Sequence, residues 1–353
     1  MSSSSSTPNI SYVSYFSGIG AAEYILQNMY KDATCLGFSE IDPHAINAYK
    51  RNFPSHENLG DITEVPMKTI EDIAKQKPTF IIGGFPCKQT SGLAKFRSKQ
   101  IGIKGKQTGL LKVLVSHLQV YLKYNPKVRI VLENTSTTKI LQKQITRLLY
   151  SKLKVRFYVA LIDSHRDLGY LQRRRRLFFT NYPLESPTLS TTQSTTQPKQ
   201  QWTDVLEPFD SVKHLAVSDR CINGLNKVMA SEPSRDGTTT FASKTRKKGP
   251  GWILEKRKSA YKSRWEYVPQ YSDTFKPYAS TLSTSSKSTM LIDARNPRYL
   301  LIRRYTKREL CRLFKFPDNW LPEDMGIFRA TMLFGNSIHT EALRYVLNQA
   351  FVK

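Results

Sequence analysis

The first half of the chain alternates short apolar runs with stretches that carry apolar residues at helical spacing. The apolar runs contain many β-branched residues and predict strands, whereas the amphipathic stretches between them predict helices. The predicted strands cover residues 11–16, 33–39, 79–83, 128–133, 155–162 and 176–180, and the predicted helices cover residues 21–29, 43–53, 67–75, 110–124 and 139–149. This alternation favours an α/β fold with an open, mostly parallel, Rossmann-like sheet. Because the strands are continuously apolar, we expect helices on both faces of the sheet.

The pattern changes beyond this half. Residues 186–201 are rich in Thr, Ser and Gln and are typical of a linker or exposed loop. Residues 220–309 have poor periodicity, and a final helix is predicted over residues 338–351. We therefore expect a disordered tail at residues 1–9, a large domain at 10–185 that is completed by 325–353, and a smaller, irregular domain at 186–324.

Charge narrows the choice of partner. The chain has 54 Lys and Arg against 28 Asp and Glu, a formal net charge of +26. Residues 220–309 alone hold 20 basic and 7 acidic side chains, and the aromatic residues among them include Trp252, Tyr261, Trp265, Tyr267, Tyr271 and Tyr278. So positive a surface predicts an anionic partner, with nucleic acid the first candidate and an anionic membrane surface the second.

Other features exclude several classes of protein. No apolar run approaches the roughly 18 residues that a membrane span needs, and the N-terminal segment lacks the basic and apolar regions of a secretory signal. The four cysteines form no Cys-x-x-Cys pair, and the histidines show no metal-binding spacing. We expect no membrane association, no metal and no disulfide framework, in an intracellular protein of the nucleus or cytoplasm.

A glycine-containing turn follows the first predicted strand and precedes the first predicted helix. We call residues 16–20, Phe16-Ser17-Gly18-Ile19-Gly20, the glycine turn. Such a turn lets the backbone approach a nucleotide-like ligand at a helix N-terminus. Glu40 follows the second strand, where a carboxylate can bind ribose hydroxyls, and Asp61 stands where adenine recognition is plausible. Alone, the turn fits a plain tight turn equally well; the ordered set favours an adenosine site.

A second group of reactive residues ends the next two strands. Pro86 and Cys87 follow a strand that ends in two glycines, at the sheet edge where open α/β folds place their reactive groups. A cysteine there either acts as a nucleophile through its thiolate or is a small buried apolar residue. Glu133 ends the following strand, where partial burial would raise its pKa and let it protonate a ring nitrogen.

Taken in chain order, the motifs resemble those of the cytosine-C5 methyltransferase family, enzymes that transfer a methyl group from S-adenosylmethionine to cytosine in DNA. The motifs are Phe16–Gly20, Glu40, Asp61, Pro86-Cys87, Glu133-Asn134, Gln172-Arg173-Arg174-Arg175-Arg176, Arg304-Tyr305-Thr306-Lys307-Arg308-Glu309, Arg312–Asp318 and Gly335-Asn336-Ser337. The resemblance covers nearly the whole chain. It implies the class I methyltransferase version of the Rossmann-like sheet, with a target-recognition domain in the basic, aromatic interval.

The resemblance also implies roles for individual residues. The cofactor would be S-adenosylmethionine and the product S-adenosylhomocysteine, bound by Phe16, Gly18, Gly20, Glu40, Ile41, Asp61, Ile62, Pro86, Leu110, Asn336 and Ser337. The Cys87 thiolate would add to C6 of a flipped cytosine, Glu133 would bind N3 and the amine, and Arg176 or else Arg174 would bind O2, with Pro86 and Asn134 beside them. Arg173 and Arg175 would form a solvated basic edge.

Double-stranded DNA is the partner that the resemblance implies, bound by a protein that we expect to be monomeric on it. A mobile loop at residues 88–107 would close over the flipped base. The predicted DNA contacts are Lys88, Ser91, Arg97, Lys244, Arg246, Lys247, Lys248 and Arg264. The chain departs from the family pattern at Lys88, where glutamine is usual, and at Thr135, where an apolar residue is common; neither departure removes a reacting group.

Two alternatives remain open from the sequence. One is methylation of cytosine in RNA, since one branch of the family modifies transfer RNA; the long basic segment and the lack of that branch's Cys-Phe-Thr signature disfavour it. The other is a catalytically silent DNA-binding relative, which the presence of Cys87, Glu133 and the cofactor glycines disfavours.

Overall fold

The computed structural model describes residues 9–86, 106–187, 199–212, 270–273, 278–279, 281–282, 289–293 and 301–351. Contacts divide the chain into two compact units. The first comprises residues 1–168, 174–195 and 337–353, and the second comprises residues 169–173 and 196–336. Each unit is described separately below.

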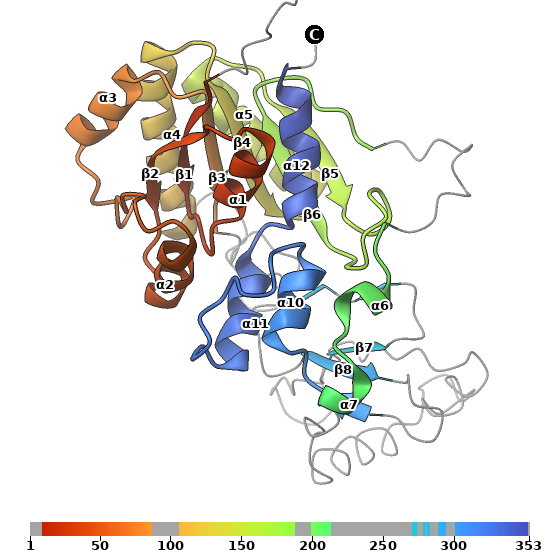
Figure 1. Ribbon diagram of the computed structural model, residues 1–353. Helices are drawn as coiled ribbons and strands as arrows, with labels where there is room; N and C mark the ends of the chain where they lie inside the picture. Colours follow the sequence, from red (N-terminus) through yellow and green to blue (C-terminus); the bar gives the residue numbers. More distant parts are fainter. Residues whose placement is uncertain are drawn as a thin grey trace, which may run out of the picture. The chain divides into compact units, whose positions relative to one another are not determined.

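The first unit is built on a six-stranded sheet with the order β2-β1-β3-β4-β6-β5 (Figure 1). Its strands are β1 (Ser11–Tyr15), β2 (Thr34–Ser39), β3 (Phe80–Gly84), β4 (Arg129–Thr135), β5 (Tyr158–Asp163) and β6 (Arg175–Thr180). Neighbours from β2 to β4 pair in parallel, and β6 lies antiparallel between β4 and β5. The predicted α/β fold with a mostly parallel sheet is therefore confirmed.

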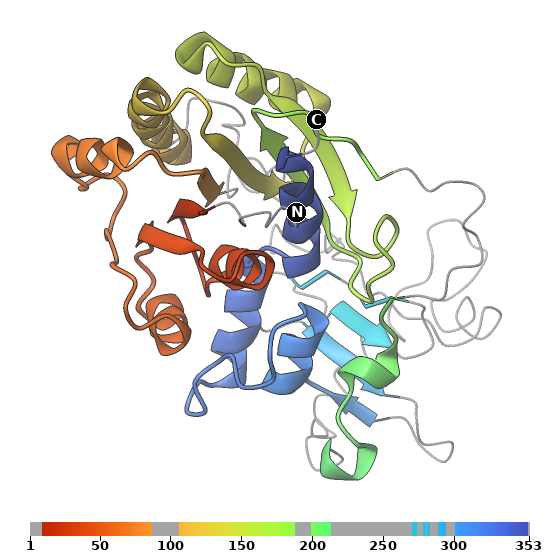
Figure 2. The same ribbon diagram turned by 45° about the horizontal axis from the view of Figure 1, so that its top comes forward.

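Helices cover both faces of this sheet. On one face α3 (Met67–Lys75), α4 (Lys106–Tyr124) and α5 (Lys139–Leu153) pack their buried apolar residues against β1, β3, β4 and β6. On the other face α1 (Ala21–Met29) lies beside α12 (Thr340–Asn348), and α2 (Pro43–Asn52) follows β2 (Figures 1 and 2). The burial of apolar side chains on both sides explains why the strands read as continuous apolar runs.

Local capping explains where several helices begin and end. The Asp42 side chain accepts from the His44 amide and starts α2 ahead of Pro43. The Thr138 side chain caps α5, which runs past the predicted end at residue 149 until Lys154 adopts φ 57°. The predicted helix 338–351 is shorter than expected, because α12 begins after His339 and the chain ends its last turn as a 3-10 helix, Gln349–Phe351.

Strand direction brings the candidate residues to one edge of the sheet. The carboxyl ends of β1, β2, β3 and β4 lie at the same edge because these strands are parallel. Because β6 is antiparallel to β4, its amino end lies at that edge as well, and Arg176 is the register partner of Thr135. The strand order reverses between β1 and β3, and open α/β sheets bind ligands outside such a switch point.

The second unit contains more regular structure than its sequence predicted. Its elements are α6 (Trp202–Val205), α7 (Phe209–Val212), β7 (Gln270–Asp273), β8 (Thr289–Asp293), β9 (Leu301–Arg303), α10 (Lys307–Leu313) and α11 (Ile327–Asn336). The three strands form a sheet in which β8 is central. The sequence predicts no strand or helix within residues 186–324, because strands of three to five residues and helices of four are too short to show a period in the sequence.

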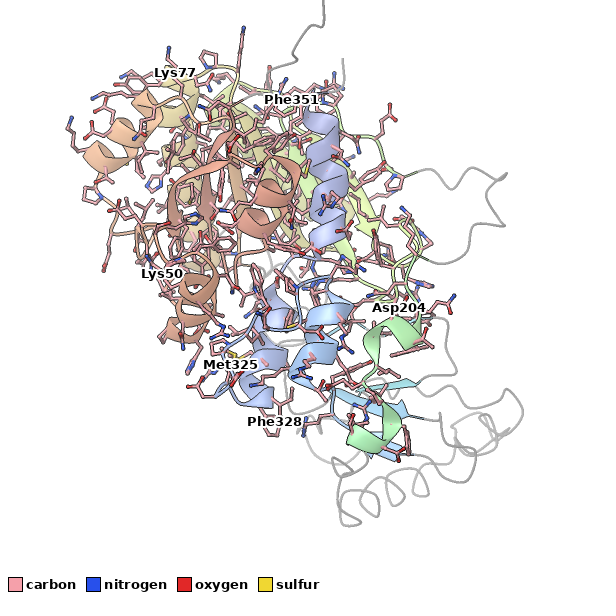
Figure 3. All side chains as sticks on the ribbon, in the orientation of Figure 1. Lys50, Lys77, Asp204, Met325, Phe328 and Phe351 are labelled. Atoms are coloured by element: carbon pink, nitrogen blue, oxygen red, sulfur yellow. The ribbon has the colours of Figure 1, made fainter. Side chains whose placement is uncertain are left out.

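Packing in the second unit centres on aromatic side chains. Phe314, Phe316, Trp320 and Phe334 contact one another between α10 and α11. At the surface, the Arg304 guanidinium lies 4.1 Å from the ring centroid of Phe328, which projects from α11 (Figure 3). The compact units divide at residue 337, whereas the predicted catalytic domain resumes at residue 325. The functional boundaries of the two domains stay a prediction.

Candidate active site

The glycine turn has the left-handed backbone that its sequence suggests. Phe16, Gly18 and Gly20 have φ values of 54°, 58° and 87°. A side chain at Gly20 would place its Cβ 2.9 Å from Phe53 Cε2, so only glycine fits there. At Gly18, by contrast, a Cβ would meet no atom within 4 Å, so this part of the backbone is open to a ligand. The Gly20 amide donates to the Ser17 carbonyl and closes the turn.

Glu40 is bonded directly to the glycine turn. Its Oε2 accepts from the Gly18 amide at 2.8 Å, and its Oε1 accepts from the Ile41 and Asp42 amides at 2.8 and 2.9 Å. Oε2, which accepts from one amide only, still has capacity for a further donor, such as a ribose hydroxyl. Ile41 beside it is 66% exposed, an apolar surface that an adenine ring would cover.

Asp61 is brought to the same edge by a residue that the sequence did not point to. Asn58 Oδ1 accepts from the Glu40 and Gly60 amides, and Asn58 Nδ2 donates to the Glu40 carbonyl. Asp61 Oδ1 accepts from the Thr63 amide and hydroxyl, both at 2.8 Å. A Cβ at Gly60 would meet no atom within 4 Å, so space is open here too. Carboxylates, open backbone and an exposed apolar side chain suit an adenosine group.

The chain leading to Cys87 is held by the neighbouring strand. Asn134 Nδ2 donates to the Phe85 carbonyl at 3.1 Å, immediately before Pro86. Gly84 is the register partner of Glu133, and a Cβ on Gly84 would lie 3.4 Å from Glu133 Oε2. Cys87 lies outside the described residues, which end at Pro86 in this segment.

Glu133 lies between two buried arginines. The Arg176 Nε is 2.9 Å from Glu133 Oε1, and both side chains are about nine-tenths buried. Burial raises the pKa of Glu133, while Arg176 and Arg174 act in the opposite direction and leave a net rise. Arg174 Nη2 donates to the Ser337 carbonyl at 2.6 Å. Arg173 and Arg175 are exposed, as their alternation along the strand dictates.

The remaining predicted residues divide into three groups. Ile62 is buried in the core and Leu110 packs at its edge, and their contacts with the cofactor stay a prediction. Asn336 is the exposed last residue of α11 in the second unit. The residues that lie outside the described part of the chain are Cys87, Lys88, Ser91, Arg97, Lys244, Arg246, Lys247, Lys248 and Arg264, together with most of the predicted loop 88–107.

Comparison with known proteins decides the family. The sequence model of the family described as C-5 cytosine-specific DNA methylase matches residues 10–351. The chain belongs to the C-5 cytosine-specific DNA methylase family. Its activity class is accordingly the methylation of cytosine at C5 in DNA. A relative named type II methyltransferase M.NlaX, from Neisseria lactamica, is 26% identical over 96% of this chain and 95% of its own length. M.NlaIV from the same organism is 24% identical over 54% of this chain and 45% of its own.

Solved structures agree on the methylase fold. A mutant of DNMT2 from Spodoptera frugiperda has a TM-score of 0.66, at 14% identity, over 98% of this chain and 100% of its own. The methyltransferase EhMeth of Entamoeba histolytica has a TM-score of 0.65, at 14% identity, over 98% of both chains. Among the described residues, none of the helices is long and apolar enough to cross a membrane, and His, Cys, Asp and Glu form no cluster that would hold a metal.

Proposed function

We propose that this methylase transfers a methyl group from S-adenosylmethionine to C5 of a cytosine in double-stranded DNA, with Cys87 as the nucleophile. The target nucleotide must leave the base stack to reach the sheet edge, because C5 and C6 are inaccessible in a duplex. The single observation that carries this proposal is the placement of Glu133, paired with Arg176 and opposite Gly84, beside the strand that leads into Pro86 and Cys87.

The cofactor would be held by the glycine turn, Glu40, Asp61 and Ile41. Bound there, S-adenosylmethionine supplies an electrophilic methyl group on a sulfonium centre. The open backbone at Gly18 admits the ligand, and the Glu40 carboxylate accepts from ribose hydroxyls while it remains bonded to the Gly18 amide. Ile41 covers one face of the adenine ring. S-adenosylhomocysteine is the product that leaves this site.

The base would be activated by three side chains. The Cys87 thiolate forms a bond to C6, and the electron pair of the 5,6 double bond moves onto C5, which gains enamine character. Glu133 bonds N3 and the exocyclic amine and supplies the proton that neutralises the ring. Arg176 bonds O2, while Arg174 holds the Ser337 carbonyl. After C5 has been methylated, the C5 proton passes to solvent water, its bonding pair restores the 5,6 double bond, and the Cys87 thiolate leaves with the pair of the C6–S bond. Glu133 takes back the proton from N3.

Replacement of the nucleophile tests this chemistry. In Cys87→Ser, we expect transfer of tritiated methyl groups to unmethylated double-stranded DNA to fall to background, because a serine hydroxyl is not ionised near neutral pH. The matched control is Cys311→Ala: this thiol is buried in α10, and burial raises its pKa to about 12, so it plays no part in the reaction. Both variants are first checked for folding by circular dichroism.

The outcomes separate the alternatives. Undiminished transfer by Cys87→Ser would overturn the mechanism. Transfer to a transfer-RNA pool but not to DNA would replace the substrate by RNA. Tight DNA binding by the wild type, with neither transfer nor S-adenosylhomocysteine binding by calorimetry, would indicate a silent relative. Bisulfite sequencing of the methylated DNA then reads the recognition sequence.

A further inference from the structure

A fully buried carboxyl group lies directly beneath the glycine turn, and neither the chemistry nor the ligand contacts above use it. Glu23 stands in the first turn of α1 and has no exposed surface. Among the described residues no cationic side chain forms an ion pair with it. Burying a carboxylate without a counter-charge is costly, so a group in this position needs an explanation.

The position of Glu23 in the helix makes the burial of its carboxyl group more unusual. Glu23 is the third residue after the helix-capping residue Gly20, where an acidic side chain ordinarily accepts from the amide of the capping residue. Here the Gly20 amide donates to the Ser17 carbonyl instead. The Glu23 carboxyl turns inward, where its Oε1 accepts from the Ser14 hydroxyl.

Ser14 connects this carboxyl to the glycine turn. The Ser14 and Ser17 hydroxyl oxygens are 2.7 Å apart, and the Ser17 amide donates to the Ser39 carbonyl at 3.2 Å. Ser17 immediately precedes Gly18, whose amide is bonded to Glu40. Two hydrogen bonds therefore connect Glu23 through Ser14 to Ser17, the residue before Gly18.

The side chains that face Glu23 carry no positive charge that could neutralise an ionised carboxylate. Tyr12 from β1, Cys35 from β2 and Tyr49 from α2 face it, and the Tyr49 hydroxyl lies 3.0 Å from His56 Nδ1. Glu23 Oε2 is buried without a partner at hydrogen-bonding distance. Lys50, on α2 beside Tyr49, donates to the His56 carbonyl and not to Glu23. Burial therefore raises the pKa of Glu23 to about 7, against smaller opposite effects of the Ser14 hydroxyl, the Glu23 amide and Tyr49.

We propose that Glu23 is a positioning residue whose protonation state sets the affinity of the glycine turn for the S-adenosyl ligand. The neutral acid keeps Oε1 as the acceptor of Ser14 and leaves no charge in the interior. The ionised form is relieved only by admitting water or by moving the first turn of α1, and either change disturbs Ser14 and Ser17. This inference rests on the proposed function, because it assigns the ligand to the same turn.

The direction of the pH dependence follows. If only the protonated form binds, apparent affinity scales with its fraction, so binding is about tenfold weaker at pH 8 than at pH 6 for a group that titrates near 7. By linkage, binding near pH 8 takes up a proton. The probe is S-adenosylhomocysteine, titrated calorimetrically at both pH values in buffers of different ionisation enthalpy.

Three variants test whether Glu23 causes the pH dependence of binding. Glu23→Gln keeps the shape of the neutral acid and should bind with the pH 6 affinity of the wild type at both pH values, without proton uptake. Ser14→Ala removes the connection and should flatten the pH profile, although Glu23 still titrates. Asp72→Asn, which replaces an exposed carboxylate paired with Lys68 and Lys75 on α3, should keep the wild-type profile.

The two proposals fail differently. A wild type that binds S-adenosylhomocysteine equally well at pH 6 and pH 8, with no proton uptake, overturns the role of Glu23 and leaves the methyltransferase proposal standing. A wild type that binds no S-adenosylhomocysteine at either pH, while folded, overturns both. The proton uptake of the wild type is decisive even if Glu23→Gln does not fold.

Discussion

At the scale of single residues, the site is defined by carboxyl groups whose surroundings differ. Glu40 accepts hydrogen bonds from three backbone amides, which hold its carboxylate beside the glycine turn. Glu133 is buried beside Arg176, and the net rise of its pKa favours its proposed role as an acid. The amide donors thus suit Glu40 to the role of hydrogen-bond acceptor, and burial suits Glu133 to the role of acid.

Glu133 is the residue on which this reasoning can be tested. In Glu133→Gln, we expect kcat for methyl transfer to fall by about 10²–10⁴-fold, the usual contribution of a general acid, because the amide bonds the base but cannot protonate it. Wild-type kcat should fall as pH rises through the raised pKa of Glu133, and the residual activity of the variant should lack that fall. Single-turnover assays across pH measure both. An unchanged kcat would remove Glu133 from the chemistry.

At the scale of elements, one ion pair organises the start of α10. Glu309 accepts from the Thr306 amide, and the Thr306 side chain accepts from the Glu309 amide, so the two form a capping box. The same carboxylate receives both Arg303 Nη atoms at 2.7 Å, with both side chains fully buried. The end of β9 and the start of α10 are thereby fixed to each other. Within the motif Arg304–Glu309, Thr306 and Glu309 therefore have a structural role.

Breaking this pair should unfold the second unit readily. We expect Glu309→Gln to lower the free energy of unfolding by about 3–5 kcal/mol, because Arg303 is left as an uncompensated buried charge. Urea unfolding followed by tryptophan fluorescence measures it, since all four tryptophans lie in the second unit.

The control for this prediction is the exposed pair of Arg312 and Asp318, whose Nε and Oδ1 are 2.8 Å apart. Asp318→Asn should cost less than about 1 kcal/mol, because solvent screens the pair. Equal effects of the two substitutions would contradict the assignment.

At the scale of the whole molecule, the net positive charge is the main determinant that we expect for DNA binding. A formal charge of +26 on 353 residues predicts that much of the free energy of DNA binding comes from released counterions. The dissociation constant should then rise steeply between about 50 and 200 mM salt, with a linear plot of log K against log salt concentration. Fluorescence anisotropy with a labelled duplex measures the slope. Affinity that does not change with salt would contradict an electrostatic mode of binding.

Much of the first unit could be predicted because its signals are local. Apolar runs predict β1 to β6, and the residues that end them predict the edge at which Glu40, Glu133 and Arg176 gather. Asn58 could not be predicted, because its value lies in contacts with Glu40, eighteen positions away. Glu23 reads as an ordinary first-turn acid, and only the packing of Tyr12, Cys35 and Tyr49 around it reveals a buried carboxyl.

The first unit is discontinuous along the chain, and this has a consequence during translation. The Arg174 guanidinium holds the Ser337 carbonyl, and the Tyr182 hydroxyl donates to the Val346 carbonyl on α12. While a ribosome is still making the intervening 140 or so residues, this face of the sheet lacks its helix, and Arg174 lacks this acceptor. The apolar surface of the nascent sheet therefore stays uncovered until the C-terminal segment has been made. A chaperone that covers that surface would raise the yield of active methylase.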